Sequence, residues 1–163
     1  MEFHDRIAIV QQFGRTYRAF LAAFEAQVGQ PMPRWRVLLA LYEQHGESSQ
    51  KRLVESLRVD PGALTRQLKT LESLGWIARS VDARDNRVTN VQLTDAGRAV
   101  VEEGLPRRNA FLNETMALPD EMLHALSTAL RQVELRIGDS AAAASAASAA
   151  SAANAAAASD DDA

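Results

Sequence analysis

The sequence predicts a mainly α-helical (α+β) fold, in which long helices at both ends of the chain enclose short helices and a β-hairpin. Apolar residues recur every three or four positions over about seven turns at the N-terminus, which is typical of a helix that packs along one side. Two short helical segments with a tight turn between them follow. Residues 76–81 and 89–93 are then expected to form strands on either side of a charged loop.

The first predicted helix carries an apolar stripe with alternating spacings of four and three residues. Gly29, Pro31 and Pro33 end this helix. A free-standing helix of this length would expose its stripe, so we expect it to pack on other helices or on a partner chain. The stripe consists of Phe3, Ile7, Val10, Gly14, Tyr17, Leu21, Phe24 and Val28.

The middle of the chain has the pattern of a helix-turn-helix. A second helix is predicted over residues 34–46, and Ser49 can cap a third over residues 50–57. Asp60 as N-cap and Pro61 at the first helical position begin a fourth helix, because the missing N–H of proline costs nothing there. Two short helices joined by a short turn, the second strongly capped, indicate a DNA-binding arrangement.

The C-terminal part of the chain is predicted to be helical. Thr94 caps a helix over residues 95–116, and Pro119 opens the last helix, which again carries apolar residues at spacings of three and four. Apolar seams at both ends indicate that the termini form a homodimer. The expected dimer interface consists of Phe3, Ile7, Val10, Leu123, Leu126, Leu130, Val133 and Ile137.

The composition limits the chemistry that the chain can perform. Hydrophobic residues make up 47% of its 163 residues, enough for a core, and there is no cysteine. The lack of cysteine excludes disulfides, cysteine-based metal sites and thiol redox switches, and it suits the reducing cytoplasm, where we expect the protein. No apolar run approaches the ~20 residues of a membrane span, so we expect no membrane partner.

The net charge of −3 is misleading as evidence against nucleic acid. Residues 139–163 are almost entirely Ala and Ser and contain four Asp but no Lys or Arg, so the rest of the chain is close to neutral. Residues 47–98 hold nine Lys and Arg against seven Asp and Glu. We assign the Ala/Ser-rich segment no function, although alanine favours helix and part of the segment can continue the last helix.

Two groups of residues are candidates for contact with DNA. On the fourth helix, polar and cationic side chains lie away from the apolar face and suit base edges and phosphates, although an ordinary solvated face explains them equally well. In the hairpin loop, Asp82 and Asp85 stand close enough to Arg84 and Arg87 to hydrogen-bond a guanidinium and fix its direction. An oriented arginine can enter a narrow minor groove. A surface salt-bridge cluster is the alternative.

Residues 49–100 resemble the winged helix-turn-helix of the MarR family of transcriptional regulators. The stretch reads SQKRLVESLRVDPGALTRQLKTLESLGWIARSVDARDNRVTNVQLTDAGRAV. Its most specific feature is the D-x-R-D-x-R loop, which Leu93, Thr94 and Gly97 follow and LTRQLKTLESLGWI precedes. The flanking helices fit the architecture of the family.

The resemblance implies an obligate homodimer that binds a palindromic operator, and we expect it to act as a repressor. Recognition helices would enter successive major grooves and wings the adjacent minor grooves. Arg84 is then the candidate for the minor groove, with Arg87 and the two aspartates bracing the loop, although either arginine could insert. The residues expected at the DNA are Ser49, Gln50, Pro61, Gly62, Thr65, Arg66, Gln67, Lys69, Arg84 and Arg87.

The resemblance also sets the expected domain organisation. A dimerisation helix over residues 1–32 precedes a winged helix-turn-helix DNA-binding domain over residues 33–98. C-terminal dimerisation helices over 99–138 and an Ala/Ser-rich tail over 139–163 follow. No nucleophile elbow, P-loop, HExxH or dinucleotide fingerprint is present, so we do not expect an enzyme. A winged-helix module that binds protein and not DNA is the alternative function.

Members of this family commonly release DNA on binding a small aromatic acid or phenol. On the first helix, His4, Arg15 and Arg18 share a face that could supply a cation, and Met32 and Trp35 could supply apolar walls. The alternative is the solvated edge of a long helix beside a core tryptophan. We expect no cofactor and no metal, because three scattered histidines make no convincing cluster.

Overall fold

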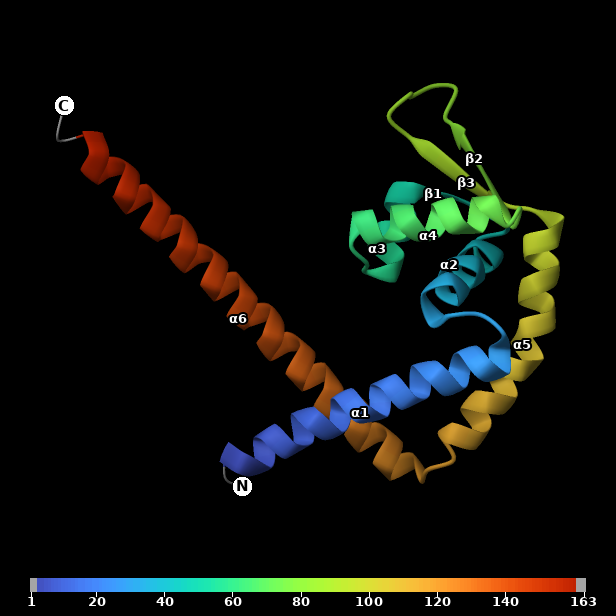
Figure 1. The fold of residues 1–163 in the computed structure, drawn as a ribbon, viewed down its shortest axis with the longest axis horizontal. Coiled ribbons are helices and arrows are strands. Elements are labelled where there is room, and N and C mark those ends of the chain that lie inside the picture. Colours follow the sequence, from blue (N-terminus) through green and yellow to red (C-terminus); the bar gives the residue numbers. More distant parts are fainter. Residues whose placement is uncertain (1–2, 161–163) are drawn as a thin grey trace. The chain divides into compact units, whose positions relative to one another are not determined.

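The computed structural model describes residues 3–160 and confirms the mainly helical fold with a small β-sheet (Figure 1). The chain forms two compact units that divide between Thr115 and Met116. The first unit contains the sheet and all helices up to Thr115, and the second contains a single helix. In chain order the elements are α1 (Phe3–Val28), α2 (Met32–Glu43), β1 (Glu47–Ser49), α3 (Gln50–Leu57), α4 (Pro61–Ser73), β2 (Ile77–Val81), β3 (Thr89–Leu93), α5 (Asp95–Thr115) and α6 (Asp120–Asp160).

The predicted helix boundaries are largely confirmed because local capping groups set them. The Ser49 hydroxyl accepts a hydrogen bond from the Arg52 N–H at the start of α3. The Asp60 carboxylate accepts one from the Ala63 N–H at 2.8 Å at the start of α4. Each bond satisfies one of the backbone donors that a helix N-terminus leaves unpaired.

Two features of the secondary structure differ from the prediction. Helix α2 begins at Met32, two residues before the predicted start, with Pro33 in its first turn. Strand β1 was not predicted, because three polar residues show no apolar alternation, and only pairing with β3 makes them a strand. Helix α6 runs through the Ala/Ser-rich segment to Asp160, so the helix continues there as alanine content allows.

The core of the first unit is built around α2, which packs on α1, α3, α4, α5 and the sheet. Trp35 of α2 is 2% exposed and lies edge-on to Phe24 of α1, with ring centroids 6.4 Å apart. Phe24 in turn lies edge-on to Phe111 of α5. Gly104 of α5 faces the indole, and a Cβ at that position would come within 2.4 Å of the ring. These contacts fix α1 and α5 against the helix-turn-helix.

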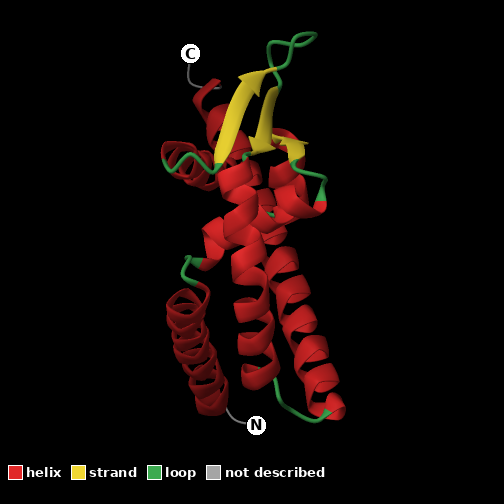
Figure 2. Cartoon of the chain, turned by 90° about the vertical axis from the view of Figure 1, so that its right-hand side faces the viewer, coloured by secondary structure: helices red, strands yellow, loops and turns green. Residues whose placement is uncertain are grey.

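The three strands form an antiparallel sheet in the order β1-β3-β2, and the loop between β2 and β3 projects from its end (Figure 2). Val91 pairs with both Ser48 and Arg79, which places these three residues on the face that packs inward. The hairpin is joined to α5 by Thr94, whose hydroxyl donates to the Gly75 carbonyl and accepts from the Gly97 N–H. Within the described residues, none of the helices combines the length and apolarity needed to span a membrane.

Candidate nucleic-acid interface

Helix α4 presents one cationic face to solvent. Leu64, Leu68 and Leu71 are buried on its inner side. Arg66 and Lys69 lie on the opposite, exposed side, as the periodicity of a helix requires. Gly62 and Pro61 are also exposed, at the N-terminal end of the same helix. These four predicted site residues therefore lie together on the surface of one helix.

Thr65 and Gln50 are bonded to each other at the junction of α3 and α4. The amide Nε2 of Gln50 donates to Oγ1 of Thr65 at 2.9 Å. The Thr65 hydroxyl itself donates to the Pro61 carbonyl at 2.8 Å. Both side chains thus hold the two helices in register, and the Thr65 hydroxyl already has a donor and an acceptor. Ser49, which caps α3, lies beside this junction.

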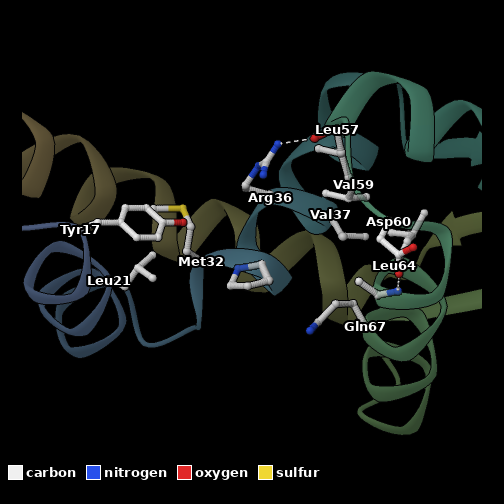
Figure 3. A pocket seen from close by; sticks show the side chains of 12 residues that line it. Tyr17, Leu21, Met32, Arg36, Val37, Leu57, Val59, Asp60, Leu64 and Gln67 are labelled. Atoms are coloured by element: carbon white, nitrogen blue, oxygen red, sulfur yellow. Dashed lines mark hydrogen bonds between the residues drawn. The ribbon is translucent and has the colours of Figure 1, made fainter. Parts of the chain in front are cut away.

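Gln67 does not lie with the exposed cations of α4. Its side chain is half-buried and, with Leu64, lines a pocket on the inner flank of the helix (Figure 3). The prediction that Gln67 shares the outer face with Arg66 and Lys69 is wrong, because a step of about 100° per residue carries it from Arg66 toward the leucines. Gln67 is therefore poorly placed for DNA in this structure.

The two aspartates of the hairpin loop brace it in a way that the sequence did not predict. Oδ1 of Asp82 accepts hydrogen bonds from the backbone N–H groups of Arg84 at 2.8 Å and Asp85 at 3.1 Å, and Oδ2 accepts from the Asn90 amide. Oδ1 of Asp85 accepts from the Arg87 N–H at 2.9 Å. The expectation that the carboxylates hold the guanidinium groups is therefore wrong, because they bind backbone N–H groups of the loop.

The guanidinium groups of the loop remain available as a result. Arg84 and Arg87 are both exposed, and neither guanidinium has a hydrogen bond or ion pair within the described residues. The pKa of the Asp82 carboxyl lies below its usual value, first because of the hydrogen bond from the Arg84 backbone N–H, then because of those from the Asn90 side-chain amide and the Asp85 backbone N–H. The loop is therefore held in one shape by a carboxylate that is ionised at neutral pH, while both arginines point to solvent.

A pocket of about 330 Å³ lies between α1, α2, the turn before α4 and α4 itself (Figure 3). Its walls are mostly apolar, and Arg36 and Asp60 are the charged residues that line it. Nη2 of Arg36 donates to the Leu57 carbonyl at 2.6 Å, at the C-terminal end of α3. The lining residues are Tyr17, Leu21, Met32, Pro33, Arg36, Val37, Leu57, Val59, Asp60, Ala63, Leu64 and Gln67.

Comparison with known proteins identifies the family. The MarR family model matches residues 31–89. The chain is 39% identical over 113 residues to the HTH-type transcriptional regulator YdgJ of Bacillus subtilis, a match that covers 69% of this chain and 68% of YdgJ. The chain belongs to the MarR family. It is a DNA-binding transcriptional regulator and not an enzyme.

Solved structures of MarR-family proteins share the fold. A MarR C80S mutant from Escherichia coli, complexed with operator DNA, aligns with a TM-score of 0.70 at 24% identity, covering 82% of this chain and 98% of that one. Bordetella bronchiseptica BpsR, whose DNA binding is regulated by 6-hydroxynicotinic acid, aligns with a TM-score of 0.66 at 26% identity. That alignment covers 78% of this chain and 98% of BpsR.

The residues predicted to bind a ligand in this MarR-family chain do not come together. Met32 lines the pocket. Trp35 is instead buried in the core, which was the alternative to a role in ligand binding. His4, Arg15 and Arg18 are exposed on α1 and do not line the pocket, and Arg15 donates to Gln12. Within residues 3–160, no three His, Cys, Asp or Glu side chains are grouped to hold a metal ion.

Sequence reasoning missed two sets of residues. Arg36 is the cation that does line the pocket, and nothing in its local pattern distinguishes it from other arginines of the chain. Lys51 and Arg52 are exposed on the first turn of α3. Their position directly after the capping Ser49 could have flagged them, because the first helix of a helix-turn-helix crosses the DNA backbone.

The bracing of the wing loop gives a testable prediction. In the folded protein Asp82 is expected to titrate below 3.8, its ordinary value. A depressed folded pKa means that its stabilisation is complete above the unfolded value and is lost only as the pH falls through the folded one. The loop should therefore keep its shape from neutral pH down to about pH 4, which carboxyl NMR shifts of Asp82 would follow.

The substitution Asp82→Ala should accelerate amide hydrogen exchange at Arg84 and Asp85, since both N–H groups lose their acceptor. The matched variant Asp85→Ala should affect the amide of Arg87 and leave those two protected. A titration midpoint at or above the ordinary value, or unchanged exchange in Asp82→Ala, would contradict this account of the loop.

Proposed function

We propose that the chain acts as a homodimeric repressor that binds a palindromic operator through α4 and the β2–β3 wing. One observation carries the proposal: Arg66, Lys69, Arg84 and Arg87 are all exposed, and both wing guanidinium groups are unpaired within the described residues. We would expect a winged helix that binds only protein to have lost these cations.

Each cation has a proposed task. Arg66 is suited to a base edge in the major groove, where a bidentate contact discriminates by about 1–3 kcal/mol. Lys69, as a point charge on a flexible stem, is suited to a phosphate. Arg84 or Arg87 at the tip of the wing is suited to the minor groove, and Gln50 and Thr65 set the angle between α3 and α4.

The proposed dimer rests on apolar side chains of α1 and α6 that neither unit covers by itself. The C-terminal end of the α1 stripe is buried at Phe24 and Val28, but Phe3 is 77% exposed and Val10 is 69% exposed. On α6, Val133 and Ile137 are also exposed. Apolar surface of this extent on two helices indicates a second chain as the covering partner.

The proposed inducer is a small aromatic acid or phenol that occupies the pocket beside α4. Arg36 can pair with the acid group, and Met32 and Leu21 supply apolar contacts for the ring. Because Asp60 and Gln67 of the recognition helix also line the pocket, an occupant would touch the helix that reads DNA. The regulation of BpsR by 6-hydroxynicotinic acid supports an aromatic acid as the class.

Selection from a random DNA library, followed by fluorescence anisotropy, tests the DNA contacts. Arg66→Ala should relax base preference at one position of each half-site. Lys69→Ala should lower affinity for all sequences and reduce the salt slope by about one. Arg84→Ala should weaken binding about tenfold and reduce the preference for A·T pairs beneath the wing, since the minor groove there loses its cation.

Arg107→Ala is the matched control, since it removes an exposed arginine of α5 that pairs with Glu103. It should leave base preference unchanged. If the wild-type chain enriches no sequence and binds no duplex at low salt, the protein-binding module becomes the better explanation.

The dimer is tested by replacing Leu126 and Leu130 with Asp, which places charges on the exposed apolar side of α6. Burying unpaired carboxylates is costly, so this double variant should be monomeric or aggregated in light scattering. Glu121→Gln, an exposed change at the start of the same helix, is the control and should remain dimeric. A wild-type protein that is monomeric at micromolar concentration contradicts the proposal.

Titration of benzoate, salicylate and 6-hydroxynicotinate into the operator complex tests the inducer. A coupling of about 1–3 kcal/mol would weaken DNA binding roughly 5–150-fold. Arg36→Gln, which keeps a donor for the Leu57 carbonyl but removes the charge, should abolish the response. Arg18→Ala, outside the pocket, should retain it. If the acid still releases DNA from Arg36→Gln but no longer does so from Arg18→Ala, the ligand binds on the outer face of α1 and not in the pocket.

A further inference from the structure

An ion pair joins the recognition helix to the wing. Nε and Nη2 of Arg79, on β2, both donate to Oε2 of Glu72, in the last turn of α4. The side chains are 24% and 39% exposed, so the pair is partly shielded from water. The hydrogen bond from Arg79 is the main reason that the pKa of Glu72 lies below its usual value. Glu72 therefore stays ionised at neutral pH and the pair is intact.

The pair spans the turn that sets the direction of the wing. Gly75, with φ at +72°, ends α4, and the Trp76 N–H donates back to the Leu71 carbonyl. Strand β2 then starts at Ile77 as an edge strand, because the sheet order is β1-β3-β2. Only β3 holds β2 from the side, so the contact with α4 through Arg79 is a second restraint on its orientation.

Small rotations at this point are amplified at the tip of the hairpin. Strand β2 ends at Val81, and Arg84 lies in the loop beyond it, five residues after Arg79 and so at most about 16 Å away. A rotation of about 10° at Arg79 would then move the tip by up to about 3 Å, as that length implies. Hydrogen-bond contacts tolerate only a few tenths of an ångström. The wing therefore needs a firm attachment at its base if its arginines are to reach a fixed groove position.

We infer that Glu72 and Arg79 are positioning residues which fix the wing relative to the recognition helix, and so determine which base pairs the wing arginines read. The inference rests on the proposed DNA binding by the wing. It assigns neither residue a contact with DNA: Glu72 would repel phosphates, and Arg79 lies in register with the buried Val91 on the inward face of the sheet.

The test compares Glu72→Gln, Arg79→Gln and the double variant with wild type by anisotropy and library selection. Each single variant should lower operator affinity about five- to tenfold, no more than the loss expected for Arg84→Ala. The double variant should be no worse than either single one, because the two groups act as a unit. Base preference beneath the wing should be lost, while preference in the major-groove half-site is kept. Arg79→Lys, which keeps the charge without the two-donor geometry, should fall between.

Glu103→Gln is the matched control, because it removes an ion pair of the same type from the exposed surface of α5. It should change neither affinity nor base preference. Base preference is the decisive readout, since a general loss of stability would weaken all sites alike. If Glu72→Gln binds as tightly as wild type or more tightly, or keeps its preference beneath the wing, the inference is overturned. Arg84→Ala, measured alongside, tests the proposed contact between wing and DNA. If Arg84→Ala also keeps the base preference beneath the wing, that contact is wrong.

Discussion

The contact between Trp35 and Gly104 is the constraint on which the rest of the first unit depends. A side chain at position 104 would place Cβ 2.4 Å from the indole, so only glycine allows α2 and α5 to approach this closely. The indole in turn packs on Phe24, which joins α1 to the same core. Since α2 also packs on α3, α4 and the sheet, this contact helps to set how those elements lie relative to α5. Deleting or enlarging a side chain in such a core costs several kcal/mol, because close-packed neighbours cannot relax fully.

The wing carries two acidic residues in the loop that we propose to bind DNA. Asp82 and Asp85 lie beside the arginines that would approach phosphates, and free carboxylates there would oppose binding. Their oxygens instead accept hydrogen bonds from backbone N–H groups of the loop. The N–H dipoles partly offset the negative charge of the carboxylates, and the bonds fix the backbone. Within the described residues, Arg84 and Arg87 therefore have no internal ion pair that the proposed DNA contact would have to break. The D-x-R-D-x-R spacing follows from this geometry, since each aspartate reaches N–H groups two or three residues ahead.

The features that the sequence predicted well are those determined within a few residues. Ser49, Asp60 and Thr94 cap helices through bonds to backbone groups nearby, and the hairpin strands alternate in a way that their own residues reveal. The features that it missed depend on distant partners. Strand β1 exists only because β3 lies beside it, and Trp35 was assigned to a pocket because nothing local indicates that Gly104 faces it. Arg36 lines a pocket that four segments of the chain build together, so no local pattern in the sequence marks it.

The pocket and the proposed DNA-binding surface share one helix, α4. Asp60 caps α4 and also lines the pocket, and Arg36 holds the C-terminal carbonyl of α3 from the other side. An acid that pairs with Arg36 would compete with that carbonyl for the guanidinium, because a carboxylate carries a full negative charge and the carbonyl oxygen only a partial one. The turn between α3 and α4 would then lose one of its attachments to α2. A ligand shifts a protein only by its differential affinity for two states, and this competition provides such a difference at the base of the recognition helix.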